Sequence, residues 1–296
     1  ELRDELQEHN DRSLALEQDG GIHICLSEKE YEARKAQLEI LYSHQNGKFK
    51  YEMLDRKALL DIQPGLGSDV VGGSWCPHDG HVNPLYLLRS LHNSFLKRNG
   101  KSLHDAEVFD IIHGEGVFDV FSRKGKFQAP CLVLAAGLGN HKLAPLIGLK
   151  QPVRPQKGQI LVTQKIDKLI DVPMTLLRQT AEGSIMIGDS KEEVGFDISS
   201  SIDIMAQIAD RARRTLPVLE KQQIIRSWAA LRVMSPDGFP IYDQSESCPG
   251  GFAITCHSGV TLAAAHCFDM AADIEAGNFG VGLQAFTERR FDVSAH

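Results

Sequence analysis

The sequence predicts an α/β protein built from two interleaved domains, and three observations lead to this prediction. A continuous apolar run at residues 131–136 is typical of a strand buried in a parallel sheet. Several runs of β character between residues 152 and 190 indicate an antiparallel sheet. A strand, a tight turn of small residues and a helix follow at 251–275. Because the antiparallel part interrupts the others, we expect two domains that alternate along the chain.

The N-terminal quarter is expected to combine helices with short strands. Asp55 precedes an apolar run in the order Asp-Arg-Lys-Ala, which is a helix-start signal. Pro84 opens an apolar-periodic helix that Gly100 closes, since proline suits the first helical turn and glycine the position after the last. The expected elements are an N-terminal helix, a strand at 21–26, a helix at 28–43, the helix from Asp55, a strand at 72–76, a turn at 78–81 and the helix from Pro84.

The rest of the chain is expected to be richer in strands. Residues 106–136 contain three consecutive strands, EVFDIIHG, GVFDVFSR and CLVLAAG, separated by glycine turns. Later elements are the strands GQILVTQ, MTLLRQT, SIMIGDS, IIRSWAALRV and GFAITC, an amphipathic helix at 201–216 and a helix from Thr261 to Glu275. One domain is therefore expected to comprise 65–150 and 225–296, and the other 1–64 and 151–224.

Composition and charge argue against several classes of protein. The chain has 296 residues, of which 42% are hydrophobic, enough to bury a core. The net charge of -7 comes from 32 basic and 39 acidic residues that are interspersed, so nucleic acid is not an expected partner. No apolar run reaches about 18 residues, and the first residues are charged. This predicts no membrane-spanning segment and a cytoplasmic location.

The cysteines and the first residue add two expectations. The six cysteines are scattered singly, with no Cys-x-x-Cys pair, so neither a disulfide framework nor a zinc or iron–sulfur centre is expected. Most are expected to be buried thiols in a reducing compartment. The sequence begins at Glu1 rather than at methionine, from which we expect a processed or truncated product.

The best local signal for a ligand site is the run GGFAITCHSGVTLAAAHC. It places a tight turn before a helix, whose first turn can present backbone N–H groups and a positive dipole end to an anion. Gly259 lets the backbone approach a ligand closely, and the alanines at 263–265 allow tight packing of the helix on a sheet. The alternative is a plain strand-to-helix unit with a glycine turn.

The run CLVLAAGLGNHKL also places a strand before a glycine turn, and its Gly137-x-Gly139 start imitates a dinucleotide-binding motif. Lys142 stands where the third glycine is required, and no acidic residue follows about 20 positions later. G-x-G-x-x-G occurs nowhere else in the sequence. The chain therefore has no complete pyrophosphate-binding motif.

Arg232 is the most informative charged residue, because it lies near the end of a largely apolar strand, just before the turn Ser-Pro-Asp-Gly. An arginine in such surroundings requires a partner, since an unpaired buried charge is costly. Its planar fork matches a substrate carboxylate. A structural ion pair with an aspartate or glutamate is the alternative.

Three weaker candidates are explained more simply. His78-x-x-His81 with Asp79 has metal-ligating residue types but is also typical of a polar turn, so we expect no metal. The order Cys-His-Ser-Gly at 256–259 resembles a hydrolase nucleophile elbow but lacks its first glycine. The carboxylates at 192–193 are interpreted as a solvated loop.

Four segments in order resemble the flavoprotein family that includes D-amino-acid oxidase, glycine oxidase and the β subunits of heteromeric amino-acid dehydrogenases. They are VLAAGLGNHKLAPLIGL, PVRPQKGQILVTQ, ALRVMSPDGFPIYD and GFAITCHSGVTLAAAHCFDMAADIEAG. The last of them, with RQTAEGSIMIGDS and FTERRFDV, is similar to β subunits of D-hydroxyproline, opine and hydrogen-cyanide-forming glycine dehydrogenases. The resemblance implies a Rossmann-like FAD-binding domain, at 65–150 and 225–296, interleaved with a substrate domain that has an antiparallel sheet.

The resemblance also implies roles for individual residues. Arg232 is expected to hold the substrate carboxylate and His257 to lie at the reacting centre. The residues expected to contact FAD are Val108, Ala136, Gly137, Gly251, His257, Ser258, Gly259, Val260 and Thr261. The implied chemistry is hydride transfer from the substrate α-carbon to the flavin, for which the protein mainly supplies orientation.

The sequence starts downstream of the G-x-G-x-x-G unit with which members of this family begin. We therefore expect the FAD site to be only half built by these residues. The expected function is dehydrogenation of a small amino or imino acid, with a second dehydrogenase subunit as electron acceptor. The alternatives are an oxidase that uses oxygen and, in another class, a cofactor-free fragment or scaffold without catalytic activity.

Overall fold

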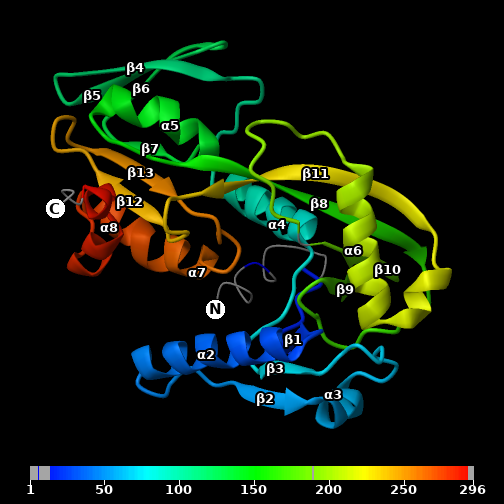
Figure 1. The fold of residues 1–296 in the computed structure, drawn as a ribbon. Coiled ribbons are helices and arrows are strands. Elements are labelled where there is room, and N and C mark those ends of the chain that lie inside the picture. Colours follow the sequence, from blue (N-terminus) through cyan, green and yellow to red (C-terminus); the bar gives the residue numbers. More distant parts are fainter. Residues whose placement is uncertain (1–5, 7–13, 189, 293–296) are drawn as a thin grey trace.

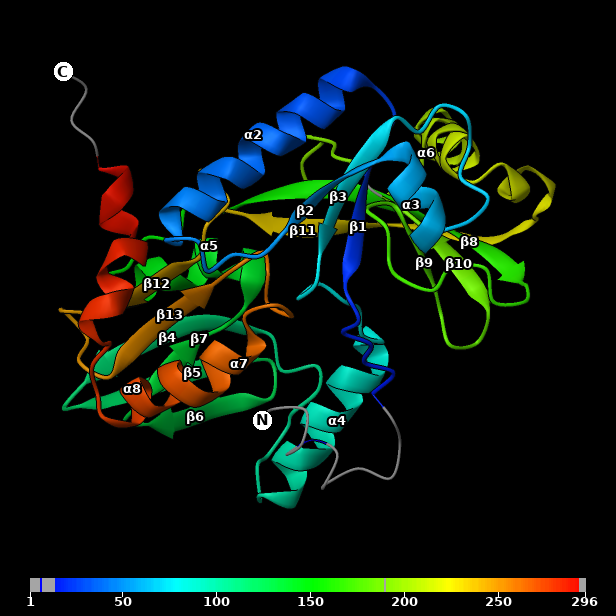
Figure 2. The same cartoon turned by 90° about the horizontal axis from the view of Figure 1, so that it is seen from below.

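The computed structural model describes residue 6, residues 14–188 and residues 190–292, and Figure 1 shows their fold. The predicted N-terminal helix lies almost entirely outside the described residues. The strands lie in two groups, one formed by residues 108–134 and 241–255 and the other by residues 21–76 and 154–234, with the helix at 202–215 beside the second group. Figure 2, seen from below, shows the same separation.

A small antiparallel sheet begins the described chain. Its strands are β1 (Gly21–Cys25), β2 (Glu52–Asp55) and β3 (Gly72–Cys76), in the order β1-β3-β2. Helix α2 (Glu28–His44) begins at Ser27, whose hydroxyl accepts the N–H of Glu30, and helix α3 (Arg56–Ile62) begins at Asp55 as predicted. An isolated parallel bridge between Ile22 and Met174 connects this sheet to the next.

The second sheet is four-stranded and antiparallel, in the order β11-β8-β10-β9. Its strands are β8 (Arg154–Lys165), β9 (Leu177–Gln179), β10 (Ser184–Ile187) and β11 (Ile224–Met234). Alternation along β8 turns Leu161 toward helix α6 (Ile202–Thr215), where it joins the largest apolar core. Its neighbour Ile160 points to the opposite face, which faces a cavity.

The other group of strands contains the parallel pair that the apolar run predicted. Strand β7 (Leu132–Leu134) pairs in parallel with β13 (Gly251–Thr255), and β12 (Ile241–Gln244) pairs antiparallel with β13. A separate sheet contains β4 (Val108–Gly114), β5 (Val117–Ser122) and β6 (Gly125–Ala129). The two sheets share a core that contains Phe118, Leu134 and Ala253.

The remaining helices are mostly short. They are α4 (Pro84–Lys97), α5 (Asn140–Leu143), α7 (Ala263–Ala265), a π-helical turn at His266–Met270 and α8 (Ala271–Glu275). Short 3₁₀ segments are Gly137–Gly139, Ala144–Ile147, Pro217–Lys221, Val281–Phe286 and Glu288–Phe291. No helix within the described ranges is long and apolar enough to cross a membrane.

The structure differs from the predicted elements in identifiable places. Strands β2, β6 and β12 were not predicted, because each is only four or five residues long and depends on pairing with a neighbour. The helix predicted over 261–275 begins at 263 and contains the π-helical turn. Strand β3 pairs with β1 and β2, and β11 pairs with β8, so both belong to sheets of the other predicted domain.

Candidate active site

The carboxyl ends of β7 and β13 lie at one edge of their sheet, because the two strands run parallel with Leu134 opposite Ala253. The turns that follow, at 136–139 and 256–262, therefore leave the sheet side by side. Ligands of open α/β sheets bind outside the carboxyl ends of the strands. The structure thus brings together two segments that are more than a hundred residues apart in the sequence.

Asn140 holds these two turns together. The only sign of this role in the sequence is that a polar residue follows a glycine turn. Its fully buried side chain donates from Nδ2 to the Leu134 carbonyl at 3.0 Å and to Thr255 Oγ1 at 2.7 Å. Its Oδ1 accepts the N–H of Ala136 at 3.0 Å. One amide therefore connects the end of β7, its turn and the end of β13.

The turn after β13 is open toward the sheet edge. Residues 257–261 are exposed. A Cβ atom placed on Gly259 would meet only the Cys256 Sγ atom, at 3.7 Å. The exposed side chain of Val260 adds apolar surface, and a helix begins two residues after Thr261. A planar, partly apolar ring system fits this surface.

His257 follows β13 and lies near positive charge. The pKa of His257 is below its usual value. Partial burial of the imidazole is the main cause, and the nearby charges of Arg232 and Lys191 lower the pKa further. The imidazole is therefore neutral at pH 7, and the positive charge at this end of the site comes from the arginine and the lysine. Such charge stabilises an anion, whether a substrate carboxylate or a reduced flavin ring.

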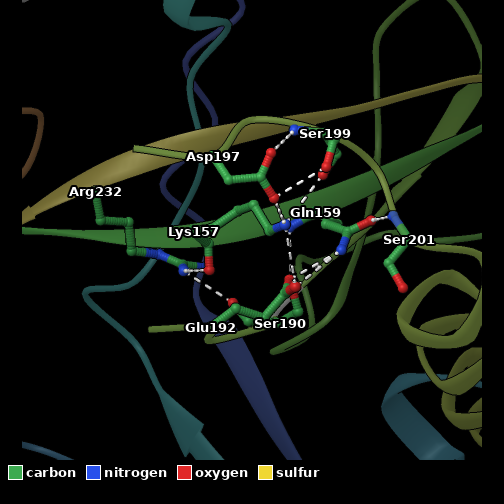
Figure 3. A network of polar contacts seen from close by, with 8 residues as sticks. All are labelled: Lys157, Gln159, Ser190, Glu192, Asp197, Ser199, Ser201 and Arg232. Atoms are coloured by element: carbon green, nitrogen blue, oxygen red, sulfur yellow. Dashed lines mark hydrogen bonds and ion pairs between the residues drawn. The ribbon is translucent and has the colours of Figure 1, made fainter. Parts of the chain in front are cut away.

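Arg232 lies on β11, and its guanidinium crosses strand β8. Its Nη1 donates to the Ser190 carbonyl at 2.8 Å and to the Lys157 carbonyl at 3.3 Å (Figure 3). A Cβ atom on Gly158 would lie 2.6 Å from both Nη1 and Nη2. Only glycine leaves room for the guanidinium in this position.

No carboxylate of the described residues forms an ion pair with Arg232. The structural ion pair considered as the alternative is thus absent from this part of the chain. Nη1 is bound to neutral carbonyls, and no acceptor for Nε or Nη2 lies among the described residues. A guanidinium held in this way can present a planar fork to an anion.

A buried ion cluster fixes the segment that supplies the Ser190 carbonyl. The Lys157 side chain is 4% exposed and lies 2.9 Å from Asp197 and 3.4 Å from Glu192 (Figure 3). Glu192 also accepts the Ser190 hydroxyl at 2.9 Å. The interpretation of Glu192 as part of a solvated loop is wrong, because its side chain is 13% exposed and contacts buried Lys157. The hydrogen bond from Lys157 lowers the pKa of Asp197 to about 2.

A cavity of about 380 Å³ opens on the face of the four-stranded sheet that carries Arg232. This volume lies within the range of small-molecule sites. The side chains that line it include Ile160, Met174 and Met186 with two arginines, Arg178 and Arg232. The sequence analysis identified Arg232 as a site residue but not Arg178. The cavity is thus apolar in part and cationic in part, which suits a small anionic substrate.

The other predicted site residues lie at different places. Val108 begins β4 and packs against the core that contains Leu134. Gly251 lies at the opposite end of β13 from His257, where a Cβ atom would come within 3.0 Å of the Cys248 carbonyl oxygen and 3.1 Å of Phe118. The structure therefore does not bring Gly251 to the edge where the other residues lie.

The weaker candidates have structural partners. His81 Nδ1 lies 3.2 Å from Arg178 Nη1, and its Nε2 lies 3.3 Å from Glu17. No group of three metal-ligating side chains occurs among the residues that the structure describes. Burial raises the pKa of the Cys256 thiol, which disfavours the thiolate that a nucleophile requires.

The residues present fit the flavin end of FAD. The open turn at Gly259, the exposed Val260 and the positive charge beside His257 offer a surface for the ring system. Ala136 and Gly137 lie at the same sheet edge, and Gly137 has a φ of 57°, which glycine adopts without strain. The sequence contains no G-x-G-x-x-G, so these residues do not account for binding of the pyrophosphate.

Comparisons with known proteins point to one family. The profile of the family described as "FAD dependent oxidoreductase" matches residues 1–272. The chain is 43% identical to an opine oxidase subunit from Agrobacterium tumefaciens (strain Ach5) over 288 residues, which cover 94% of this chain and 75% of the relative. It is 30% identical over 205 residues, 67% of this chain, to hydrogen cyanide synthase subunit HcnC of Pseudomonas protegens, of which the match covers 49%.

The fold agrees with these sequence matches. The crystal structure of glycine oxidase from Geobacillus kaustophilus superposes with a TM-score of 0.87 at 22% identity, over 100% of this chain and 80% of that one. Together with the family match, the superposition confirms the predicted α/β fold class, an FAD-binding domain with a substrate domain. With the profile match over most of its length, the chain belongs to the DAO family of FAD-dependent oxidoreductases.

Proposed function

We propose that this chain oxidises the carbon–nitrogen bond of a small amino or imino acid whose carboxylate binds Arg232. The observation that supports the proposal is the position of Arg232 and the set of atoms that it contacts. It lines a cavity of about 380 Å³, is held by two neutral carbonyls and lacks a carboxylate partner among the described residues. The relatives named opine oxidase and glycine oxidase support a substrate of this class.

The residues of the chain would act mainly by orientation. Arg232 binds the carboxylate at one end, and the apolar side chains of Ile160 and Met186 border the substrate. The positive charges of the arginines lower the pKa of a bound ammonium group, which favours the neutral amine that can be oxidised. FAD, when bound, supplies the acceptor for the hydride released as the carbon–nitrogen single bond becomes a double bond.

A second subunit is the electron acceptor that we propose. Two of the relatives are named as subunits, which supports an enzyme of more than one chain. A cytoplasmic location is part of the proposal. The expectation that most cysteines are buried thiols is wrong, because only Cys25 and Cys76 are buried. Peroxide formed in amounts equal to the substrate oxidised by the isolated protein would instead favour the oxidase alternative.

The test begins with visible absorbance spectra of the purified protein with FAD. We expect bound-flavin bands that bleach without oxygen on addition of sarcosine, proline or a larger secondary amino acid. Arg232→Met should lower kcat/KM by one to two orders of magnitude, because hydrogen bonds to charged groups contribute about 1.5–3 kcal/mol. Arg226→Met is the matched control, because Arg226 lies on the same strand outside the cavity and packs on Trp228.

Two results would contradict the proposal. A protein that never retains FAD would favour the cofactor-free scaffold. Equal loss of activity in Arg226→Met and Arg232→Met would show that disturbance of strand β11, and not the loss of carboxylate binding by Arg232, lowers the activity.

A further inference from the structure

The face of the four-stranded sheet that carries the cavity is also the face on which Arg232 lies. Arg232 is opposite Gln156 of β8, and alternation along β8 places Gly158 on the same face, beneath the guanidinium. The side chain of Lys157, with its ion cluster, therefore lies on the other face, which helix α6 covers. Among the described residues, Arg232 meets this cluster through two backbone carbonyls, those of Lys157 and Ser190.

Ser190 connects the two faces, because two of its oxygen atoms have different partners. Its carbonyl oxygen accepts a hydrogen bond from Arg232 at 2.8 Å, and its hydroxyl accepts the backbone N–H of Gln159 at 2.8 Å (Figure 3). In an antiparallel ladder, such an N–H is normally paired with a carbonyl of the neighbouring strand. The Ser190 hydroxyl therefore takes the place of a carbonyl at Gln159 and leaves the Ser190 carbonyl to Arg232.

The ion cluster fixes the position of this hydroxyl. The hydroxyl donates to Glu192 Oε1 at 2.9 Å, and the same oxygen accepts Gln159 Nε2 at 2.9 Å. The backbone N–H and carbonyl of Glu192 pair with the carbonyl and N–H of Lys157, at 3.0 Å and 2.9 Å. Ser190 is 8% exposed and Gln159 is fully buried, so water is kept away from the bond between them. A buried N–H of this kind requires a protein acceptor.

We propose that the Ser190 hydroxyl is a positioning group for substrate binding, because it occupies the Gln159 N–H and so reserves the Ser190 carbonyl for Arg232. This inference rests on the proposed function, in which Arg232 binds the substrate carboxylate. Without the hydroxyl, the Gln159 N–H needs another acceptor, and the carbonyl of the same residue becomes that acceptor. Arg232 and the N–H would then compete for one carbonyl, and the guanidinium would lose its fixed place.

Two unreactive ligands separate this role from a general loss of structure. (Methylthio)acetate carries a carboxylate, and (methylthio)acetamide is its neutral counterpart of nearly the same shape. Titration of the FAD-loaded protein, followed by perturbation of the flavin spectrum, should show the carboxylate binding at least tenfold more tightly than the amide. Ser190→Ala should reduce this preference to less than threefold and change the affinity for the amide by less than twofold, because only the charged group requires the guanidinium in its place.

Three further variants identify the responsible atom. Ser190→Thr keeps the hydroxyl and should retain the preference for the carboxylate. Ser190→Cys has a side chain of similar length whose sulfur is a weak acceptor, so it should lose the preference and serves as the test variant if Ser190→Ala does not fold. Ser201→Ala is the matched control, because Ser201 joins the network through its backbone N–H, which donates to Gln159 Oε1 at 2.9 Å, and its side chain does not cap helix α6. This control should bind both ligands as the wild-type protein does.

The outcomes distinguish this inference from the proposed function. A wild-type protein without a preference for the carboxylate, or an Arg232→Met variant that keeps the preference, would overturn the proposed function. Loss of the preference in Arg232→Met but not in Ser190→Ala would overturn the role of the Ser190 hydroxyl alone. The same would follow if Ser190→Thr or Ser201→Ala lost the preference as fully as Ser190→Ala, because the hydroxyl would then not be the group that matters.

Discussion

Gly158→Ala should damage carboxylate binding while leaving the fold intact. The new Cβ atom would lie 2.6 Å from Arg232 Nη1 and Nη2, and ordinary contact begins at 3.4 Å, so the guanidinium must move by roughly 0.8 Å. The hydrogen bond from Nη1 to the Ser190 carbonyl is 2.8 Å long. A movement of this size stretches it beyond about 3.2 Å, the usual limit for such a bond.

Because the displaced guanidinium no longer lies where the carboxylate binds, the expected loss of substrate binding is close to that of one charged hydrogen bond, about 1.5–3 kcal/mol, or roughly 10- to 150-fold in KM. Substitution of a strand glycine by alanine restricts the unfolded chain, which offsets part of any strain in folding. The stretched bond to Ser190 belongs to the folded protein, so we expect the free energy of unfolding to fall by no more than about 1.5 kcal/mol, the usual net contribution of one hydrogen bond. Steady-state kinetics and urea denaturation of the FAD-loaded protein measure the two quantities.

Gly114→Ala is the matched control, because Gly114 ends strand β4 and has no atom within 4 Å of a new Cβ. A Gly158→Ala variant with unchanged KM would refute the reasoning, since it would show that the guanidinium position over β8 does not matter. A rise of KM in both variants would point to a general effect of glycine replacement.

Two further predictions concern buried polar groups. Asn140→Ala should lower the free energy of unfolding by about 1–3 kcal/mol, because it leaves buried backbone groups without partners. It should also weaken FAD binding, which a fluorescence titration measures. Unchanged FAD affinity would argue against the role of Asn140 at the two turns. Burial raises the pKa of Asp243 to about 6, so this group favours folding at low pH and loses that contribution as pH rises through 6. Asp243→Asn should therefore raise the melting temperature at pH 7.5 more than at pH 4.5. The Gln151 side chain, whose Oε1 has no hydrogen-bond partner among the described residues, can turn to accept a hydrogen bond from the new amide. An equal change in melting temperature at both pH values would contradict the prediction.

The elements that were predicted correctly are those whose signals lie within a few neighbouring residues of the sequence. The cap at Asp55, the apolar strand β7 and the strand-turn-helix order after Gly251 are all formed as expected. Arg232 was recognised because a charge at the end of an apolar strand is anomalous whatever its partner. The family resemblance then supplied the cofactor and the order of the domains, and the profile match confirms the family.

The parts of the site that were missed depend on contacts between distant segments. Lys157 and Glu192 are 35 residues apart, and only the pairing of β8 with the segment after β10 brings them together. Arg178 lies on a three-residue strand with no periodicity, and its place in the cavity follows from the strand order β11-β8-β10-β9. Strand order is a property of the whole sheet, so no local pattern encodes it.

The way in which Arg232 is held has a consequence for how this enzyme can change over evolutionary time. Its anchors are the carbonyl oxygens of Lys157 and Ser190, and every amino acid supplies a carbonyl oxygen. A substitution at either position keeps the carbonyl itself, but the place of the Ser190 carbonyl still depends on the ion cluster around Lys157, and Gly158 must keep the space clear. The carboxylate end of the cavity thus tolerates change outside this cluster, whereas the position of Arg178 also depends on the side chains of His81 and Met186.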